Sequence, residues 1–185
     1  MTTTAEAIAP SASVEALRSA SRLAAIWRAL ATVPDPEIPV VSIVELGIVR
    51  DVGFEADTVV VTVTPTYSGC PATELIMQSI GEALSALDCA SVRIDRRIAP
   101  PWTTDWIAPE AKAKLKQFGI APPAEAAQRV NVAGISPLRR AQVAVPCPRC
   151  GSKQTTLTAQ FGSTACKAQY RCEACLEPFD YFKPF

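Results

Sequence analysis

Histidine is missing from the sequence, which deprives a cysteine nucleophile of its usual proton acceptor and leaves thiolate, carboxylate and backbone groups for any chemistry. Excess charge of one sign is missing too, because 18 Lys and Arg balance 18 Asp and Glu. This balance gives no electrostatic reason to expect binding of nucleic acid or of an anionic membrane. No convergent set of acid, base and nucleophile is visible either. We therefore expect a protein that is not an enzyme.

Long hydrophobic runs are the third absence. No stretch approaches the roughly 18 apolar residues that a membrane-spanning helix needs. The N-terminal MTTTAEAIAPSAS lacks the cationic and apolar regions of a secretory signal. These features predict a cytoplasmic protein with a disordered leader over residues 1–13. A chain of 185 residues can bury one ordinary core and carry a smaller module beside it.

Between residues 14 and 98 the sequence alternates between helical and strand periodicity. Apolar residues that include Leu17, Leu23 and Leu30 recur at three- and four-residue steps, as on an amphipathic helix. Runs rich in Val, Ile and Thr predict strands. The expected elements are a helix over residues 14–32, strands over 48–54 and 58–64, a helix behind Pro71, and a strand over 91–98. This order predicts an α+β fold, a small α/β sandwich of about one hundred residues whose last two strands are parallel neighbours.

From residue 99 to residue 145 the composition shifts towards proline and alanine, which is typical of a linker arm. Within this segment a short helix is expected from Pro109 to Phe118, ended by Gly119. Trp102 and Trp106 are expected to anchor the arm on a core or on a partner.

Four of the seven cysteines form two CxxC pairs between residues 146 and 185. Cys147 and Cys150 are separated from Cys172 and Cys175 by the 21 residues from 151 to 171. This spacing lets four thiolates surround one metal ion and predicts a zinc ribbon over residues 146–185. Iron in a rubredoxin-like centre is the alternative metal, and disulfides or plain core cysteines are the alternative without one. Since four protein ligands leave no open position for substrate, we expect a structural metal. Residues 141–185 carry five basic and three acidic side chains, and four thiolates on a divalent metal cancel this charge of +2, so we expect the ribbon to dock on another protein rather than on phosphate.

A fifth cysteine lies in the stretch TPTYSGCPATE, at the corner where a predicted strand gives way to a predicted helix. A thiolate at Cys70 would be stabilised by the helix dipole and by unpaired N–H groups, and Gly69 leaves room for a partner to approach. Cys70 is therefore a candidate metal ligand or redox thiol, with packing in the core as the alternative. Cys89 is expected in the core, and Cys166 as a packing residue or a spare thiol.

The stretches DPEIPVVSIVELGIVRDV (residues 35–52) and VTVTPTYSGCPA (residues 61–72) resemble the domain shared by the MIP18-type iron–sulfur assembly proteins. The DPE step, the LGIV segment and the GCP corner occur in the same order, and the resemblance covers residues 14–98. With the arm and the four-Cys ribbon included, the whole chain is similar to the family of D proteins encoded with the phenylacetyl-coenzyme A epoxidase of bacterial phenylacetate degradation. This resemblance implies an accessory protein of a ring-oxidising monooxygenase that assembles or delivers an iron–sulfur cluster, with the reductase component as its client.

The resemblance also implies roles for single residues. Cys70 matches the motif cysteine that handles iron or a transient cluster. Asp35 and Glu37 fall in the family's acidic loop, and Thr64 and Thr66 in its Thr-rich strand end. For the two carboxylates, turn formation is the alternative role. The ribbon cysteines match the family's zinc ligands, Cys147, Cys150, Cys172 and Cys175.

The expected partners follow from the same resemblance. They are the reductase and the other components of the monooxygenase, together with iron–sulfur assembly proteins, and a homodimer would supply a second Cys70 to a cluster. Two other functions stay open from the sequence. One is a non-catalytic structural subunit that holds the monooxygenase together, and the other is a small electron carrier with a rubredoxin-like iron centre in its tail.

Overall fold

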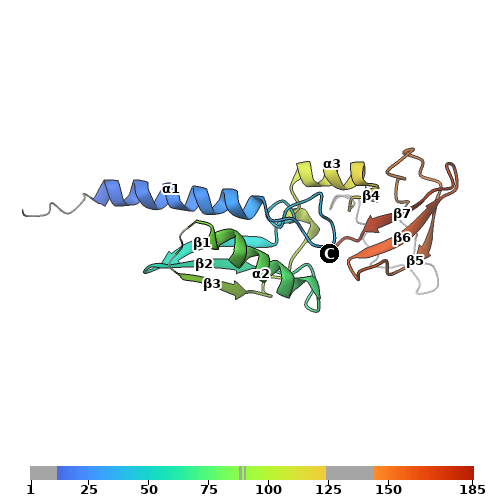
Figure 1. The fold of residues 1–185 in the computed structure, drawn as a ribbon. Coiled ribbons are helices and arrows are strands. Elements are labelled where there is room, and N and C mark those ends of the chain that lie inside the picture. The colour runs from blue at the N-terminus through green and yellow to red at the C-terminus, as the bar shows by residue number, and fades with distance from the viewer. Residues whose placement is uncertain (1–11, 88, 90, 124–143) are drawn as a thin grey trace, which may run out of the picture.

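The computed structural model describes residues 12–87, 89, 91–123 and 144–185, and Figure 1 shows them as two bodies lying side by side. We call residues 12–98 the sandwich domain, residues 99–123 the arm, and residues 144–185 the ribbon. The leader expected over residues 1–13 lies outside the described residues except for its last two, which already belong to the first helix. The part of the expected linker from residue 124 to residue 143 also lies outside them.

The sandwich domain has the predicted order of elements. These are α1 (Ala12–Ala31), β1 (Val49–Glu55), β2 (Thr58–Val63), α2 (Ala72–Ser85) and β3 (Ser91–Arg96). β1 pairs antiparallel with β2, and β2 pairs parallel with β3. The helix α2 is the crossover that a parallel pair requires, so the predicted parallel neighbours are confirmed. Because α1 contacts both α2 and β1, the two helices form one layer on the sheet.

The buried stretch of α1 is shorter than the predicted apolar stripe. Ile26 and Leu30 are buried in the core, whereas Leu17, on the predicted apolar stripe, is 71% exposed. Figure 1 shows the reason, since the N-terminal turns of α1 extend past the end of the sheet. Only the C-terminal half of the helix therefore contributes to the core. Among the described residues no helix is both long and apolar enough to cross a membrane.

A close approach of the arm to the sandwich domain explains the glycine of LGIV. Gly47 has a φ of +69°, and a Cβ at this position would lie 2.7 Å from the Cβ of Trp106. Trp106 belongs to the short helix η1 (Thr104–Trp106), and the Cζ of Arg50 lies 3.4 Å from the centroid of its ring. This position therefore requires glycine both for its backbone conformation and for space.

The arm is anchored by a tryptophan, as predicted. Trp102 is buried, and its Nε1–H donates to the Leu46 carbonyl at 3.0 Å. The helix α3 (Pro109–Phe118) ends at Gly119, whose φ of 96° provides the predicted left-handed cap. The arm then continues into β4 (Ile120–Ala121), which is a strand of the ribbon sheet.

The ribbon sheet has the strand order β4-β7-β6-β5. β5 (Thr155–Ala159), β6 (Lys167–Cys172) and β7 (Pro178–Phe182) are antiparallel neighbours, and β4 pairs parallel with β7. The structure therefore confirms an α+β fold in which a small sandwich is followed by a four-Cys ribbon.

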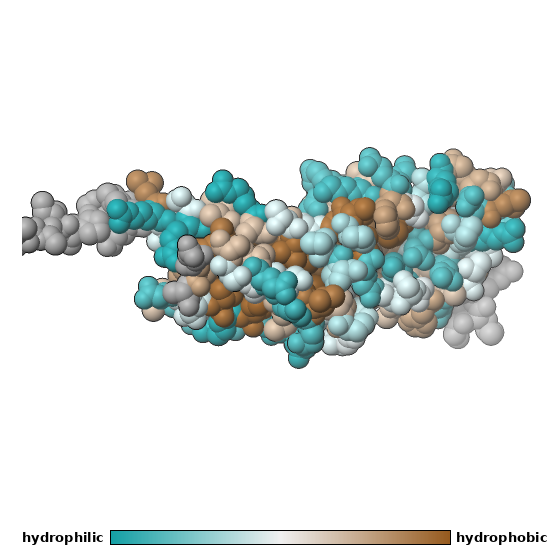
Figure 2. Space-filling model, in the orientation of Figure 1, coloured by the Kyte–Doolittle hydropathy of each residue, from teal (hydrophilic) through white to brown (hydrophobic). Residues whose placement is uncertain are grey.

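Two residues of the ribbon, Cys166 and Phe182, belong to the sandwich core. Phe182, at the end of β7, is 1% exposed, and its ring centroid lies 5.9 Å from that of Trp102. Figure 2 shows hydrophobic residues gathered in the middle of the molecule, where the sandwich domain meets the ribbon. The ribbon also has a small interior of its own, which includes Cys147, Cys172 and Tyr181. Each body thus has an interior of its own, and Phe182 and Cys166 of the ribbon join the core of the sandwich domain.

Replacing Phe182 with alanine should lower the free energy of unfolding by about 3–5 kcal/mol, because the change leaves a cavity in the sandwich core. The control is Phe161→Ala in the same module, since Phe161 is 64% exposed and its loss should cost less than about 1 kcal/mol. Urea unfolding followed by tryptophan fluorescence measures both values. Equal losses for the two variants would contradict the docking role of Phe182.

Candidate metal and thiol sites

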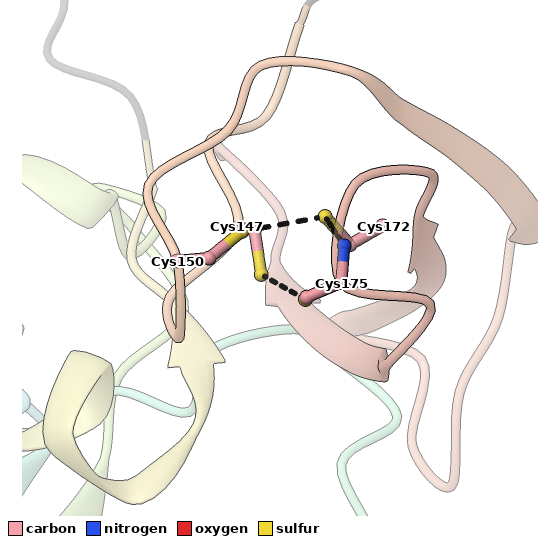
Figure 3. A group of neighbouring side chains, drawn as sticks. All are labelled: Cys147, Cys150, Cys172 and Cys175. Atoms are coloured by element: carbon pink, nitrogen blue, oxygen red, sulfur yellow. Dashed lines mark hydrogen bonds between the residues drawn. The ribbon is translucent and has the colours of Figure 1, made fainter.

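The four cysteines of the CxxC pairs point towards one another (Figure 3). Their Sγ atoms all lie within 4.8 Å, with Cys147 and Cys175 3.8 Å apart and Cys150 and Cys172 3.5 Å apart. Four sulfurs placed about 2.3 Å from a zinc ion are separated by about 3.8 Å at the edges of their tetrahedron. The group therefore fits zinc, and the same four-sulfur tetrahedron suits iron. All seven cysteines are free thiols, against the alternative of two disulfides.

Each CxxC pair is held in a tight turn with a left-handed residue directly after its second cysteine. In the first turn this residue is Gly151, with a φ of 75°, whose N–H donates to the Cys147 carbonyl at 2.9 Å. In the second turn it is Leu176, with a φ of 62°, a conformation that is unfavourable for a residue with a side chain. The repeated turn explains how two pairs that are distant in sequence present equivalent sulfurs to one site.

The protonation of the ribbon thiols favours a bound cation. A hydrogen bond from the Cys175 N–H, joined by that of Ala174, lowers the pKa of Cys172 to about 7 against the effect of burial. A hydrogen bond from the Glu177 N–H lowers the pKa of Cys175, but burial and the thiols of Cys172 and Cys150 together raise that pKa to about 12. Four thiolates this close repel one another, and a divalent metal ion would remove that repulsion.

The predicted corner places Cys70 directly before α2, with Pro71 at the helix cap. The Cys70 N–H donates to the Tyr67 carbonyl at 3.1 Å, and the Cys70 carbonyl accepts the N–H and the hydroxyl of Thr73 at 3.2 and 2.9 Å. The Cys70 side chain is half-buried, and a Cβ at Gly69 would meet no neighbouring atom within 4 Å. The main chain of the corner is therefore fixed on both sides, while space is open beside the thiol.

The acidic loop of Asp35 and Glu37 forms a turn, which is the alternative role considered for these two carboxylates. Asp35 is buried, and its Oδ1 accepts the N–H groups of Glu37 and Ile38, both at 2.9 Å. Burial raises the pKa of Asp35 above its ordinary value, although the two N–H groups and the Lys167 ammonium act to lower it. Ionised Asp35 is thus under-compensated in this loop, and a cation beside it would be stabilising.

Two small cavities, each of about 20 Å³, bring most of the predicted residues to Cys70. Asp35, Thr66 and Cys70 line both cavities, and Glu37 lines the second. A cavity of this size has room for about one water molecule. The sequence therefore identified a group of side chains that are neighbours in space although they lie on two separate segments.

Thr64 is placed outside this group. It is buried, and its N–H donates to the Ile48 carbonyl at 2.8 Å. It lines a different groove, which also includes Trp102 and Phe185. Thr64 is separated from the Cys70 cavities because it continues the backbone pairing at the end of β2.

The ribbon contributes a further cysteine, Cys166, to the second cavity beside Cys70, and no sequence pattern reveals this. Cys166 is 8% exposed and lines the second cavity together with Thr164 and Tyr67. The next residue, Lys167, is also buried, with Nζ 3.7 Å from the carboxylate of Asp180. Cys166 lies outside the CxxC pairs and belongs to no local motif. Only the packing of the ribbon on the sandwich domain reveals its position.

Known protein families match the chain in two segments. Residues 23–95 match the family described as "Iron-sulfur cluster assembly protein", and residues 133–183 match the family described as "PaaD zinc beta ribbon domain". The first segment contains the acidic loop and Cys70, and the second contains the four ribbon cysteines and Cys166.

Single relatives follow the same division. The chain is 48% identical over 158 residues to a protein of Escherichia coli K12 named as the putative D component of 1,2-phenylacetyl-CoA epoxidase, covering 85% of this chain and 90% of that protein. It is 37% identical over 92 residues to the "Fe-S protein maturation auxiliary factor" of Porphyromonas gingivalis, covering 49% of this chain and 87% of that protein. Among solved structures, a domain of unknown function (DUF59) from Bacillus anthracis superposes with a TM-score of 0.51 and 29% identity, covering 54% of this chain and 96% of that one.

Replacing Cys150 with serine should remove the metal and unfold the ribbon, because structural metal binding supplies folding free energy to such a module. Elemental analysis and thermal melting measure the two effects, and the analysis of the wild type identifies the metal. The matched control is Cys89→Ser, since Cys89 is half-buried outside the four-Cys group, and it should keep the wild-type metal content. A Cys150 variant that kept both its metal and its melting transition would count against the four-thiolate site.

Replacing Asp35 with asparagine should change how stability depends on pH. Because burial raises the pKa of Asp35 in the folded state, the folded protein binds this proton more tightly than the unfolded chain does, and stability falls as pH rises through that pKa. The free energy of unfolding of the wild type, minus that of Asp35→Asn, should therefore decrease as pH rises above about 4. Urea unfolding at a series of pH values measures the difference, with Asp57→Asn in the exposed turn between β1 and β2 as the baseline for losing one carboxyl group. A difference that grows with pH would show that Asp35 is stabilised in its charged form.

Proposed function

Because the chain belongs to the family of D proteins of 1,2-phenylacetyl-CoA epoxidase, in which an iron–sulfur assembly domain is joined to a zinc β ribbon, we propose that it is an accessory protein of phenylacetate catabolism. In this role it handles iron or an iron–sulfur cluster at Cys70 in the cytoplasm and delivers it to the reductase component of the epoxidase. One observation carries the proposal, which is the grouping of Cys70 with Asp35 and Glu37 around a single small cavity.

The chemistry of these side chains suits a metal that is held briefly. Cysteine thiolates are the usual ligands of iron–sulfur clusters, and the carboxylates of Asp35 and Glu37 add oxygen donors and negative charge beside Cys70. A single protein thiolate with weaker oxygen neighbours binds iron less firmly than four thiolates do, so the cargo can leave. Thr66, at the edge of both cavities, would donate a hydrogen bond from its hydroxyl to the bound species.

The proposal makes this chain a maturation factor that is not itself an enzyme. Two kinds of relative support it, since the relative that spans most of the chain is named as part of an epoxidase and a shorter one is named as an Fe–S maturation factor. The ribbon, in turn, would hold zinc for structure and recognise the monooxygenase component. A four-thiolate site filled entirely by the protein offers no position for substrate.

A structural subunit of the monooxygenase is the second candidate, favoured by the name of the relative from Escherichia coli, which calls that protein a subunit of the epoxidase. In that case Cys70 would only pack, and the protein would copurify stably with the other components. The third candidate, an electron carrier, requires iron in the ribbon and a visible absorption band. The elemental analysis of the wild type already separates it from the other two.

Cluster delivery is tested by the iron and acid-labile sulfide content of the reductase after coexpression. The reductase is produced with the wild type, with Cys70→Ala, with Cys89→Ala as a matched thiol control, and without this protein. We expect the reductase to be as poor in cluster with Cys70→Ala as with no partner, and full with Cys89→Ala. Thermal melting of Cys70→Ala checks that the corner still folds, since a half-buried cysteine leaves little cavity.

The other outcomes separate the candidates. A reductase that is full of cluster in all four cultures would overturn cluster delivery and leave the structural subunit as the function. A reductase depleted only when the whole protein is missing, and restored by Cys70→Ala, would place the active group elsewhere in the chain.

A further inference from the structure

The Cys70 cavity is closed on one side by the ribbon. Cys166, just before β6, is part of the ribbon in sequence but packs with the core of the sandwich domain rather than with the ribbon's own interior. It is 8% exposed and lines the same cavity as Cys70, Asp35 and Glu37. Two cysteines and two acidic residues from three separate segments of the chain therefore line one small space.

Cys166 has a hydroxyl partner and charged neighbours. Its Sγ lies 3.0 Å from the hydroxyl of Thr164. Burial raises the pKa of the Cys166 thiol, the Thr164 hydroxyl and the Lys167 ammonium lower it, and the charges of Glu37 and Cys70 raise it again. Tyr67 at the rim of the cavity feels the same charges, since burial and then Cys70, Cys166 and Glu37 raise its pKa.

When they ionise, the thiols and carboxylates of the residues that line this cavity repel one another. A cation bound between the groups would turn their mutual repulsion into attraction, as it does in any site built from anionic ligands. The cavity of about 20 Å³ has room for one atom-sized ligand in this closed arrangement.

We propose that Cys70 and Cys166 are the two thiol ligands of an iron site shared between the sandwich domain and the ribbon, with the carboxylates of Asp35 and Glu37 as its oxygen donors. The inference rests on the proposed function of Cys70 and adds a ligand from the other body of the chain. On binding ferrous iron, each thiol releases one proton to solvent as its Fe–S bond forms, so no oxidant or reductant is needed. The four ribbon cysteines remain a separate site.

The shared site is wider than the ribbon site. Among the described residues, the group of three or more cysteine, aspartate or glutamate ligands whose donor atoms all lie within 4.8 Å of one another is the one formed by the ribbon cysteines. The ligands of the shared site must therefore draw together on binding. This requirement weakens binding and suits a cargo that is later released.

The test is an anaerobic titration of the full-length zinc-loaded protein with ferrous iron, in one arm alone and in the other with sulfide. Thiolate-to-iron charge-transfer absorption and bound iron per chain are measured for the wild type, Cys70→Ala, Cys166→Ala and the control Cys89→Ala. Loss of even an outer-shell partner weakens metal affinity by about ten- to a hundredfold, so each ligand variant should bind iron at least about tenfold more weakly. Uptake from iron alone identifies a single ion as the ligand, and uptake only with sulfide identifies a cluster held by the same thiols.

Alkylation of the thiols, mapped by mass spectrometry, gives a readout that does not depend on activity. Iron should protect Cys70 and Cys166 together in the wild type, and Cys166→Ala should abolish the protection of Cys70. The zinc content and the circular dichroism spectrum check that each variant is folded. Cys166→Ser, which keeps a small polar side chain beside Thr164, replaces the alanine variant if that variant fails these checks.

The outcomes distinguish this inference from the proposed function. If Cys166→Ala and Cys166→Ser bind iron as the wild type does while Cys70→Ala does not, the shared site is wrong and the function of Cys70 stands. If all variants bind iron equally, the site itself is wrong, and the coexpression result decides separately whether Cys70 acts in delivery.

Discussion

The burial of Phe182 against Trp102 determines where the parts of this molecule lie relative to one another. Phe182 ends β7 and is the register partner of Lys167, the first residue of β6. The carbonyl of Cys166, the residue before Lys167, accepts the N–H of Lys183 at 2.9 Å. Once the phenylalanine ring is buried in the sandwich core, the strand pairing therefore carries Cys166 to the same boundary. The position of Cys166 beside the Cys70 cavity follows from strand register and one buried ring.

The four-Cys site of the ribbon and the Cys70 cavity differ in how their side chains are held in place. In the ribbon, two equivalent turns fix four sulfurs within 4.8 Å, and the ligands come from one small module with its own interior. Around Cys70, the residues that line the cavity come from the acidic loop, the corner before α2 and the ribbon, so no single element can hold them rigidly. A rigid set of four thiolates retains a metal as part of the fold. A mixed set assembled between two bodies can bind a metal and lose it again.

How much could be predicted from the sequence depended on how local each signal is. The CxxC pairs, Gly119 as a helix cap and the strand runs act over a few residues, and the structure confirms each of them. The stripe on α1 was wrong at Leu17, because periodicity shows which face could be buried and not how far the sheet reaches. The prediction of Cys166 as a packing residue is confirmed by its burial in the sandwich core. Its place beside Cys70 and Glu37 could not be predicted, because these residues lie 96 and 129 positions earlier in the sequence and no spacing rule connects them.

A shared site also couples cargo binding to the contact between the two bodies. Two thiolates chelate one ion only while the ribbon stays on the sandwich domain, so separating the bodies would leave each thiol with a monodentate and much weaker hold. Every tenfold loss of affinity corresponds to about 1.4 kcal/mol, which is well below what a client protein gains by burying a standard interface. A client that binds the ribbon and loosens its contact at Phe182 could therefore release iron with a small part of its binding free energy. The same coupling gives a reason for completing a transfer site with the module that we propose recognises the client.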